Sequence, residues 1–365
     1  MENLERKSLY DDLMSSGFSD KYAKFYIKCI EEEEQNPLYN KEYGRWALEK
    51  GFLYSNARAY ALDDNNYCDY LSDKDFYKLW PINSWSRIWV DDKLTLKYML
   101  NGTEFSHIMP KYYYYSTPNG LRGLMDNQDN GQSIEDLILL IKKVGEIACK
   151  PNNGTGSNGF YKLSFANNNF FINKSKTDIE EVRLFVKEHP NYIFTEYLHP
   201  SKEFAKINNL IHTLRVVTVN TNGDNPRIIG GYMRFGTSMH GEANHMSKNV
   251  DSQSLFDFLV DVDFDKGRIH NSKLVYFDKV VDSPKHPESQ VLVDMEIPNW
   301  TKLKSEILGI ARYFGNLEFL GFDFGITDMG PKLMEINTHP GIKYMQLFHS
   351  LYEDEKTKMW LKGKL

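Results

Sequence analysis

The sequence is poor in cysteine, lacks a long apolar run and carries no excess of positive charge. Its three cysteines, Cys29, Cys68 and Cys149, are an odd number without a close pair. That spacing argues against a disulfide framework and against a cysteine zinc site, and it fits a reducing compartment. Because no apolar run reaches the roughly 18 residues that a spanning helix needs, we expect no membrane span. The charged residues 1–6 are unlike a signal peptide, and we therefore expect a cytoplasmic protein.

The charge balance and the composition are typical of a soluble globular protein. Fifty acidic residues against 44 lysines and arginines give a net charge of −6, which provides no basic field for a nucleic-acid partner. Hydrophobic residues make up 41% of the chain and charged residues 26%, which argues against disorder. At roughly 150 residues per domain, 365 residues suggest two or three packed units.

The pattern of apolar residues changes along the chain and predicts an α+β protein. Residues 1–85 are mostly amphipathic, including a helix that Ser19 caps and that carries an apolar stripe. From residue 86 strands alternate with helices, which is typical of a mixed enzyme fold. The predicted helices cover about 134–144, 178–189 and 300–313, and the predicted strands include 192–198, 214–220 and 227–235.

The most informative stretch, residues 321–337, is predicted to form a hairpin with one apolar and one polar face. Phenylalanines and isoleucines, with Met334 on the returning strand, alternate with polar residues. Residues 328–330 suit a three-residue loop with its glycine in a left-handed conformation. Such a loop pairs Thr327 with Pro331 and therefore sets Asp323 opposite Glu335. Asn337 then follows one diagonal step away on the same face.

Opposed carboxylates on one strand pair predict a cation site. At a Cβ separation of about 5 Å the two charges repel and destabilise the sheet. A divalent cation removes this repulsion, and the oxygen ligands of Asp323, Glu335 and Asn337 suit Mg²⁺ together with substrate phosphates. A solvent-facing strand with hydrated acids is the alternative. It is less favoured, because the apolar partner face and the Glu-x-Asn spacing occur together.

A glycine-rich loop and a later acidic strand end complete a possible nucleotide pocket. Lys150-Pro151 precedes three glycines within residues 154–159, whose backbone N–H groups could approach phosphate oxygens without hindrance from a Cβ. The loop is neither a P-loop nor a dinucleotide fingerprint, and taken alone it also fits a surface hairpin tip. Strand 192–198 could offer its backbone to a purine, with Glu196 and Glu203 accepting ribose hydroxyls. A surface ion pair is an equal alternative for Glu196.

Together these elements resemble the ATP-grasp ligases. The resemblance extends past Asn337 through Thr338-His339-Pro340-Gly341, as in D-alanine–D-alanine ligase, and residues 91–97 are similar to the opening Asp-Lys helix of the family. Residues 212–218 and Arg234-Phe235-Gly236 are similar to segments of the sugar-transfer-associated ATP-grasp proteins of polysaccharide gene clusters. The resemblance covers roughly residues 86–345, so the N-terminal helical region lies outside it.

The resemblance implies an ATP-grasp fold that holds ATP between two α+β lobes. It divides the chain into a helical region (1–85), a linker with the small lobe (86–195) and a large lobe with the metal site (196–365). It also assigns roles to individual residues. Those expected to contact ATP are Lys93, Lys97, Lys150, Gly154, Gly156, Ser157, Gly159, Glu196, Leu198 and Glu203, and those expected to hold Mg²⁺ are Asp323, Glu335 and Asn337.

One departure from the family pattern affects the catalytic assignment. D-alanine–D-alanine ligase has an arginine two residues before the first metal carboxylate, where this chain has Gly321. We assign the task of stabilising the transferring phosphoryl group to Arg215, secondarily to Arg234, beside Lys150. The alternative for both arginines is a structural ion pair on a strand.

The expected activity is that of an ATP-dependent carboxylate–amine ligase that forms an amide through an acyl phosphate. By resemblance, the substrates are a sugar acid or amino acid and a small amine, sugar-linked among the options, in capsule or surface polysaccharide biosynthesis. A small-molecule phosphotransferase and a non-catalytic nucleotide-binding module are the alternatives. We expect specificity to come from residues 1–85 and from the loops near His240 and His339. The sequence does not determine whether the protein forms a homodimer.

Overall fold

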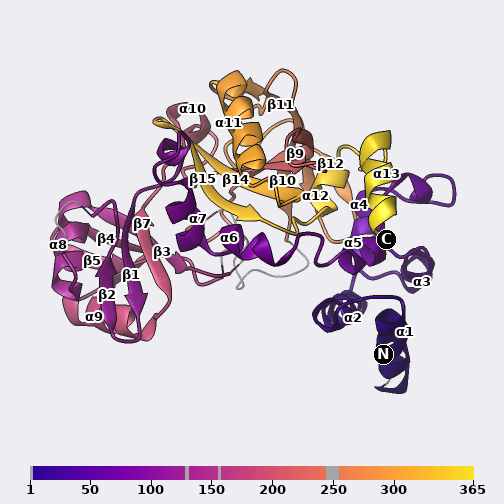
Figure 1. Cartoon of the computed structure of the whole chain (residues 1–365), viewed down its shortest axis with the longest axis horizontal. Coiled ribbons are helices and arrows are strands. Elements are labelled where there is room, and N and C mark those ends of the chain that lie inside the picture. Colours follow the sequence, from indigo (N-terminus) through magenta and orange to yellow (C-terminus); the bar gives the residue numbers. More distant parts are fainter. Residues whose placement is uncertain (1–2, 128–130, 155–157, 244–254) are drawn as a thin grey trace.

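The computed structural model describes residues 3–127, 131–154, 158–243 and 255–365. Helices precede the first strand, and two antiparallel sheets follow (Figure 1). No helix in these described ranges is both long and apolar enough to cross a membrane.

The N-terminal part of the chain is helical, as its pattern predicts. Ser19 caps α2 by accepting a hydrogen bond from the backbone N–H of Tyr22. The sequence predicts an apolar stripe on α2 of Tyr22, Phe25, Tyr26, Cys29 and Ile30. Tyr26 and Ile30 are buried as expected, whereas Phe25 is 45% exposed and Ala23 and Ile27 are buried instead. The helices of this part are α1 (Asn3–Ser15), α2 (Asp20–Glu34), α3 (Lys41–Glu49), α4 (Tyr54–Ala59), α5 (Asp73–Lys78), α6 (Ile88–Asp91) and α7 (Lys93–Leu100), with the 3₁₀ turns η1 (Tyr67–Asp69), η2 (Trp85–Arg87) and η3 (Ser106–Ile108).

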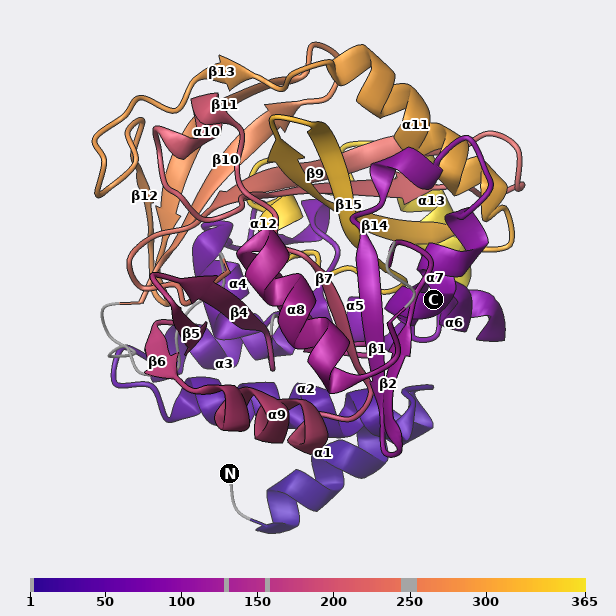
Figure 2. The same ribbon diagram turned by 90° about the vertical axis from the view of Figure 1, so that its left-hand side faces the viewer.

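The first sheet has seven described strands in the order β2-β1-β7-β3-β4-β5-β6, all antiparallel. Helices α8 and α9 pack on it, and their apolar residues share one core with the strands (Figure 2). Ser133 and Asp136 form a capping box at α8, and Asp178 caps α9. The elements are β1 (Tyr112–Thr117), β2 (Gly120–Gly123), α8 (Ile134–Val144), β3 (Glu146–Pro151), β4 (Tyr161–Ala166), β5 (Asn169–Ile172), β6 (Ser175–Thr177), α9 (Ile179–Glu188) and β7 (Tyr192–Glu196).

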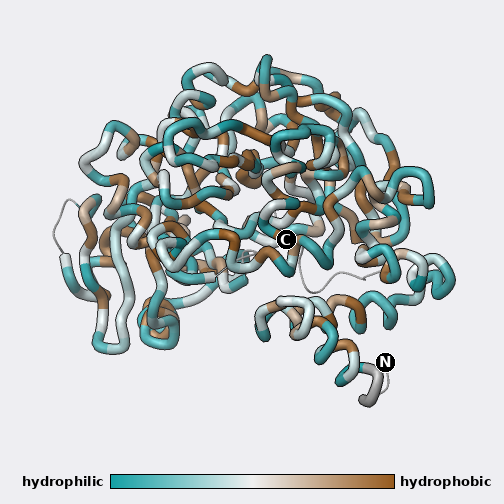
Figure 3. Tube along the Cα trace, turned by 45° about the vertical axis from the view of Figure 1, so that its right-hand side comes forward, coloured by the Kyte–Doolittle hydropathy of each residue, from teal (hydrophilic) through white to brown (hydrophobic). Residues whose placement is uncertain are grey.

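The second sheet has eight described strands, in the order β12-β11-β10-β9-β8-β14-β15 with β13 beside β11. One face packs against α11 and the other against α5, α12 and α13. Apolar segments gather inside this layered arrangement, whereas many of the loops are hydrophilic (Figure 3). The elements are α10 (Lys202–Ala205), β8 (Thr213–Val219), β9 (Arg227–Phe235), β10 (Asp257–Asp263), β11 (Arg268–Val275), β12 (Val280–Asp282), β13 (Met295–Glu296), α11 (Trp300–Tyr313), β14 (Phe319–Thr327), β15 (Gly330–Asn337), α12 (Lys343–Gln346) and α13 (Glu355–Lys364).

The hairpin of β14 and β15 confirms the predicted carboxylate pair but not the predicted turn. Thr327 pairs with Gly330, so the loop has two residues rather than three, although Gly330 has the expected positive φ of 96°. A bulge at Met334 shifts the register by one residue and sets Asp323 opposite Glu335. The bulge also brings Met334, expected on the apolar face, to the lining of the adjacent cavity.

Candidate functional site

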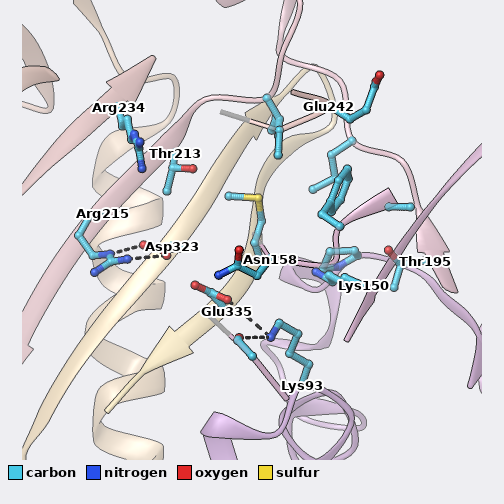
Figure 4. Close-up of a pocket in the computed structure, with 18 of the residues that line it drawn as sticks. Lys93, Lys150, Asn158, Thr195, Thr213, Arg215, Arg234, Glu242, Asp323 and Glu335 are labelled. Atoms are coloured by element: carbon cyan, nitrogen blue, oxygen red, sulfur yellow. Dashed lines mark hydrogen bonds and ion pairs between the residues drawn. The ribbon is translucent and has the colours of Figure 1, made fainter. Parts of the chain in front are cut away.

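A cavity of about 410 Å³ lies between the two sheets and gathers most of the predicted residues. Strands β3 and β7 of the first sheet line one side, and β8, β9, β14 and β15 of the second sheet line the other. We call it the first cavity. The labelled lining residues in Figure 4 are Lys93, Lys150, Asn158, Thr195, Thr213, Arg215, Arg234, Glu242, Asp323 and Glu335.

The three predicted metal ligands lie together at the end of this hairpin. The side-chain amide of Asn337 donates to Asp323 Oδ2 and to Glu335 Oε1, at 3.3 Å each. Burial raises the pKa of Asp323 to about 6, against the opposing effect of Arg215. Burial also opposes ionisation of Glu335, but Lys93 and Arg215 outweigh it and lower the pKa of Glu335.

This donor set fits Mg²⁺. Magnesium in nucleotide enzymes is held by one or two carboxylates together with substrate phosphates. The opposed carboxylates of Asp323, which is buried, and Glu335, which is 25% exposed, supply that number. Turning the Asn337 amide would present its oxygen to the same space. In the described part of the chain, no group of three or more histidines, cysteines or acidic residues forms a separate metal site.

Arg215 lies beside the carboxylates because β8 pairs with β14 and sets Arg215 opposite Asp323. Its guanidinium donates to both carboxylate oxygens, with Nη2 2.7 Å from Oδ2. Arg234, on β9, pairs with Asp257, and Lys343 lines the same end of the first cavity. Three cations therefore line the cavity here, of which two are paired with carboxylates, while Lys343 Nζ donates to the Ser55 hydroxyl at 3.1 Å.

Two lysines approach the carboxylates from the opposite side. Lys93 Nζ lies 3.7 Å from Glu335 Oε2 and donates to the backbone oxygen of Gly154 at 2.9 Å. Burial, together with the charge of Lys93, lowers the pKa of Lys150 to about 8. Asn152 fixes this arrangement, because its side-chain amide donates to Asp92, the N-cap of α7, at 2.6 Å.

The adenine-side predictions divide between the cavity and the surface. Glu196 and Leu198 line the first cavity, and Glu196 also accepts the Lys111 backbone N–H at 2.9 Å. Glu203 does not reach the cavity lining, since its side chain is 69% exposed and pairs with Lys206 at 2.6 Å.

Among the residues expected at the phosphates, Lys97 lies apart from the cavity lining. It is buried against Asp126 at 2.8 Å and donates to the backbone oxygen of Pro110 at 2.9 Å. Gly154 lines the cavity, whereas Gly159 does not. Gly156 and Ser157 lie outside the described residues.

Several residues that line the cavity were not predicted from the sequence. Lys343 and Tyr344 follow the Thr338–Gly341 segment closely, and that proximity was the available signal. Tyr232 lies one strand away from Arg215, its partner in the register of β8 and β9. Glu242 contributes from the loop after β9, where no motif indicated a role.

Comparisons with known proteins extend these observations. A family model described as "Sugar-transfer associated ATP-grasp" matches residues 81–356. The fold is similar to an L-amino acid ligase from Bacillus licheniformis (11% identity, TM-score 0.34, covering 70% of this chain and 42% of that one). It is also similar to D-alanyl-alanine synthetase A from Vibrio cholerae O1 biovar eltor (14% identity, TM-score 0.40, 76% and 65%).

A third similar structure is titled as the ATP-grasp ligase PsnB with a precursor variant, Mg and ADP (11% identity, TM-score 0.36, 76% and 60%). The chain thus spans between 42% and 65% of the length of these three proteins. No curated protein matches the sequence.

Proposed function

The chain belongs to the sugar-transfer associated ATP-grasp family and has the α+β ATP-grasp fold after a helical N-terminal region, and we propose that it is an ATP-dependent carboxylate–amine ligase. ATP binds in the first cavity, between the small lobe (86–195) and the large lobe (196–365). One observation carries the proposal: two opposed carboxylates share a cavity with two lysines on one side and two arginines on the other.

The two charged sides suit the two reactants that a ligase must bring together. Lys93 and Lys150 face the carboxylates from the first sheet and from α7, where they can neutralise ATP phosphates. Glu196 and the backbone of Leu198 offer hydrogen-bonding groups to adenine and ribose. Mg²⁺ held by Asp323, Glu335 and Asn337 would neutralise and orient the β- and γ-phosphates.

The basic end of the cavity holds the carboxylate substrate and the transferring phosphoryl group. Arg215 is the group nearest to the metal carboxylates, and Arg234 and Lys343 extend the positive charge away from them. Preorganised cations of this kind stabilise the charge that develops on the phosphoryl oxygens. A sugar acid or amino acid destined for a surface polysaccharide supplies the carboxylate in this proposal.

The reaction has two balanced steps. A carboxylate oxygen attacks the γ-phosphorus, the bond from phosphorus to the β–γ bridging oxygen breaks, and ADP leaves with that electron pair. The amine nitrogen then attacks the acyl carbon, the bond from carbon to the phosphate oxygen breaks, and inorganic phosphate leaves. The proton that the amine loses passes to the departing phosphate or to water. Amide, ADP and phosphate are the products.

The test is ADP release from ATP and Mg²⁺ across sugar acids and amino acids, each with and without a pool of amines. A ligase requires both an acid and an amine. A stable phosphorylated product from one acceptor alone would contradict the proposal in favour of a phosphotransferase. Nucleotide binding without ADP release under any condition would indicate a non-catalytic binding module.

A matched pair of variants ties the turnover to the site. Glu335→Gln keeps the size of the side chain but removes one carboxylate charge, so we expect kcat to fall by about 100- to 1,000-fold. Glu188→Gln makes the same chemical change on an exposed residue of α9 outside the cavity, so we expect kcat and the KM for ATP to stay within about twofold. Equal effects of the two changes would contradict the assignment.

A further inference from the structure

Arg234 lines the first cavity from the same face of the second sheet as Arg215. The register of β8 and β9 sets Arg234 opposite Thr213 (Figure 4). The same register sets Arg215 opposite Tyr232. Because residues two apart on a strand share a face, these four side chains project to one side, and all four line the cavity. The place of the Arg234 guanidinium on this face therefore bears on what the basic end of the cavity can hold.

Asp257, the first residue of β10, is a buried carboxylate that lies outside the lining of the first cavity. Its side chain is 2% exposed. Phe258 pairs with Phe235 across β10 and β9, which sets Asp257 diagonally to Arg234 on the same face of the sheet. Arg234 Nη2 donates to Asp257 Oδ1. Asp257 therefore contacts a residue of the cavity wall without lining the cavity itself.

The same carboxylate holds a second residue of the lining. Tyr344, on α12, donates its hydroxyl to Asp257 Oδ2, so each carboxylate oxygen accepts from a different element of the fold. Burial, reinforced by the charge of Asp257, raises the pKa of Tyr344 and keeps the hydroxyl protonated. The Tyr344 ring lies edge-on to Tyr232, with 5.5 Å between the centroids. Asp257 thus fixes Arg234 and Tyr344 relative to each other.

His240 approaches the same carboxylate from the loop after β9. Its ring is buried, and Nε2 lies 4.0 Å from Asp257 Oδ1. The Thr237 backbone N–H donates to Nδ1 at 2.6 Å, so the neutral ring carries its proton on Nε2, toward the carboxylate. Arg234, Tyr344 and His240 thus all present protons to Asp257. The position requires an acceptor on both oxygens, which aspartate supplies and asparagine does not.

We propose that Asp257 is a positioning residue for the acid substrate: it holds Arg234 and Tyr344 in the arrangement that binds the carboxylate. This inference rests on the proposed ligase function. An unrestrained arginine side chain loses rotamer entropy when a ligand fixes it. The hydrogen bond to Asp257 removes that loss from the binding step, because it orders the guanidinium before the substrate arrives.

The test first measures acid binding without turnover. Titration calorimetry of the full chain, with Mg²⁺ and a non-hydrolysable ATP analogue, uses glucuronate, galacturonate, L-alanine and L-glutamate as probes. We expect at least one of these acids to bind. Asp257→Asn should weaken that binding by about tenfold, because an amide cannot accept from both donors. The affinity for the ATP analogue should stay within about twofold, a split that general misfolding would not produce.

Asp261→Asn is the matched control. Asp261 is also a buried carboxylate of β10, it pairs with His349 at 3.2 Å, and it lies outside the cavity lining. The chemical change is the same, so acid binding should change by less than about twofold. An effect of Asp261→Asn as large as that of Asp257→Asn would overturn the inference.

A double-mutant cycle tests whether Asp257 acts through Arg234. Arg234→Met should itself weaken acid binding, and adding Asp257→Asn should then weaken it by less than about threefold, because the positioned residue is gone. Stability should behave differently: the double variant leaves neither charge unpaired, so it should be more stable in urea than Arg234→Met alone. Fully additive losses of acid binding would contradict the positioning role. So would wild-type acid binding by Asp257→Asn, or no binding of any probe to the wild type.

The outcomes also separate this inference from the proposed ligase activity. Acid binding that depends on Asp257, without amide formation from any pairing of acid and amine, would support the positioning role and contradict the ligase. Amide formation in which Asp257→Asn leaves both kcat and the KM for the acid unchanged would support the ligase and contradict the inference.

Discussion

Replacing Arg215 with methionine tests whether its pairing with Asp323 is a buried charge pair or an incidental contact. The two side chains are only 14% and 8% exposed and make two parallel hydrogen bonds. Charges about 4 Å apart at an effective dielectric constant near 20 attract by about 4 kcal/mol. Removing one partner from a buried pair costs about 3–5 kcal/mol, because the other charge is left unpaired. We therefore expect Arg215→Met to lower the free energy of unfolding by about 4 kcal/mol.

The double variant Arg215→Met/Asp323→Asn separates stability from activity. It leaves no buried charge unpaired, so it should regain most of the lost stability. It should not regain ADP release, since both the phosphoryl-stabilising cation and a metal carboxylate are gone. Urea denaturation monitored by circular dichroism gives the free energies, and the slope must match that of the wild type for the comparison to hold.

An exposed ion pair provides the control. Arg268 and Asp294 pair at the surface through two parallel hydrogen bonds, with side chains 53% and 35% exposed, so Arg268→Met should lower the free energy of unfolding far less than Arg215→Met. The reasoning is refuted if Arg215→Met costs no more than this control. It is also refuted if the double variant is no more stable than Arg215→Met alone.

Three further predictions follow from the same geometry. The pKa of Lys150 is about 8, so its ammonium loses the proton as the pH rises, and ATP affinity should fall between about pH 7 and 9. Fluorescence titration measures the affinity, and the same pH dependence of ATP affinity in Lys150→Arg would contradict this prediction. A Cβ on Gly231 would lie 2.0 Å from the Arg215 backbone oxygen, so Gly231→Ala should lower the unfolding midpoint in urea and slow ADP release, whereas Gly363→Ala, in open space, should do neither. Chelation of Mg²⁺ should abolish ADP release, and persistence of turnover would contradict the metal assignment of Asp323 and Glu335.

The carboxylate hairpin shows how far local pattern determines this fold. Alternation of apolar and polar residues predicted both strands, and the structure confirms that Asp323 faces Glu335. The predicted loop was one residue too long, and the bulge at Met334 restores the pairing of Asp323 with Glu335. A bulge depends on how a strand packs against its neighbours, and the pattern of a single strand does not encode it.

Lys97 and Glu203 are predicted site residues that do not line the first cavity. Lys93 and Lys97 lie one helical turn apart on the same face of α7, so a motif alone cannot rank them. The turn moves Lys97 about 5–6 Å along the helix axis, where Asp126 pairs with it instead. Glu203 lies on the short helix α10 and points to solvent beside Lys206. Each side chain pairs with an opposite charge that the motif does not include, Asp126 for Lys97 and Lys206 for Glu203.

The local sequence pattern also did not predict how the N-terminal helices dock. Their amphipathic stripes predicted helices, but not which surface each stripe covers. Glu33 of α2 accepts the backbone N–H groups of Tyr54 and Ser55 at 2.7 and 3.0 Å, which caps α4. Lys343, in the large lobe, then donates to the Ser55 hydroxyl at 3.1 Å. These contacts join segments almost 300 residues apart, so only the folded chain reveals them.

The helical region and the family core therefore line two cavities that share Lys93, Gly154 and Glu335. Lys343 lines the first cavity and is held from α4, while Tyr22 of α2 lines a neighbouring cavity of about 250 Å³ that also contains Glu335 in its lining. Glu335 stands between the cavities, so a reactant in either one meets the same carboxylate. If the core provides ATP binding and phosphoryl transfer, then sequence changes in the helices should alter which amine is accepted without altering how ATP is held.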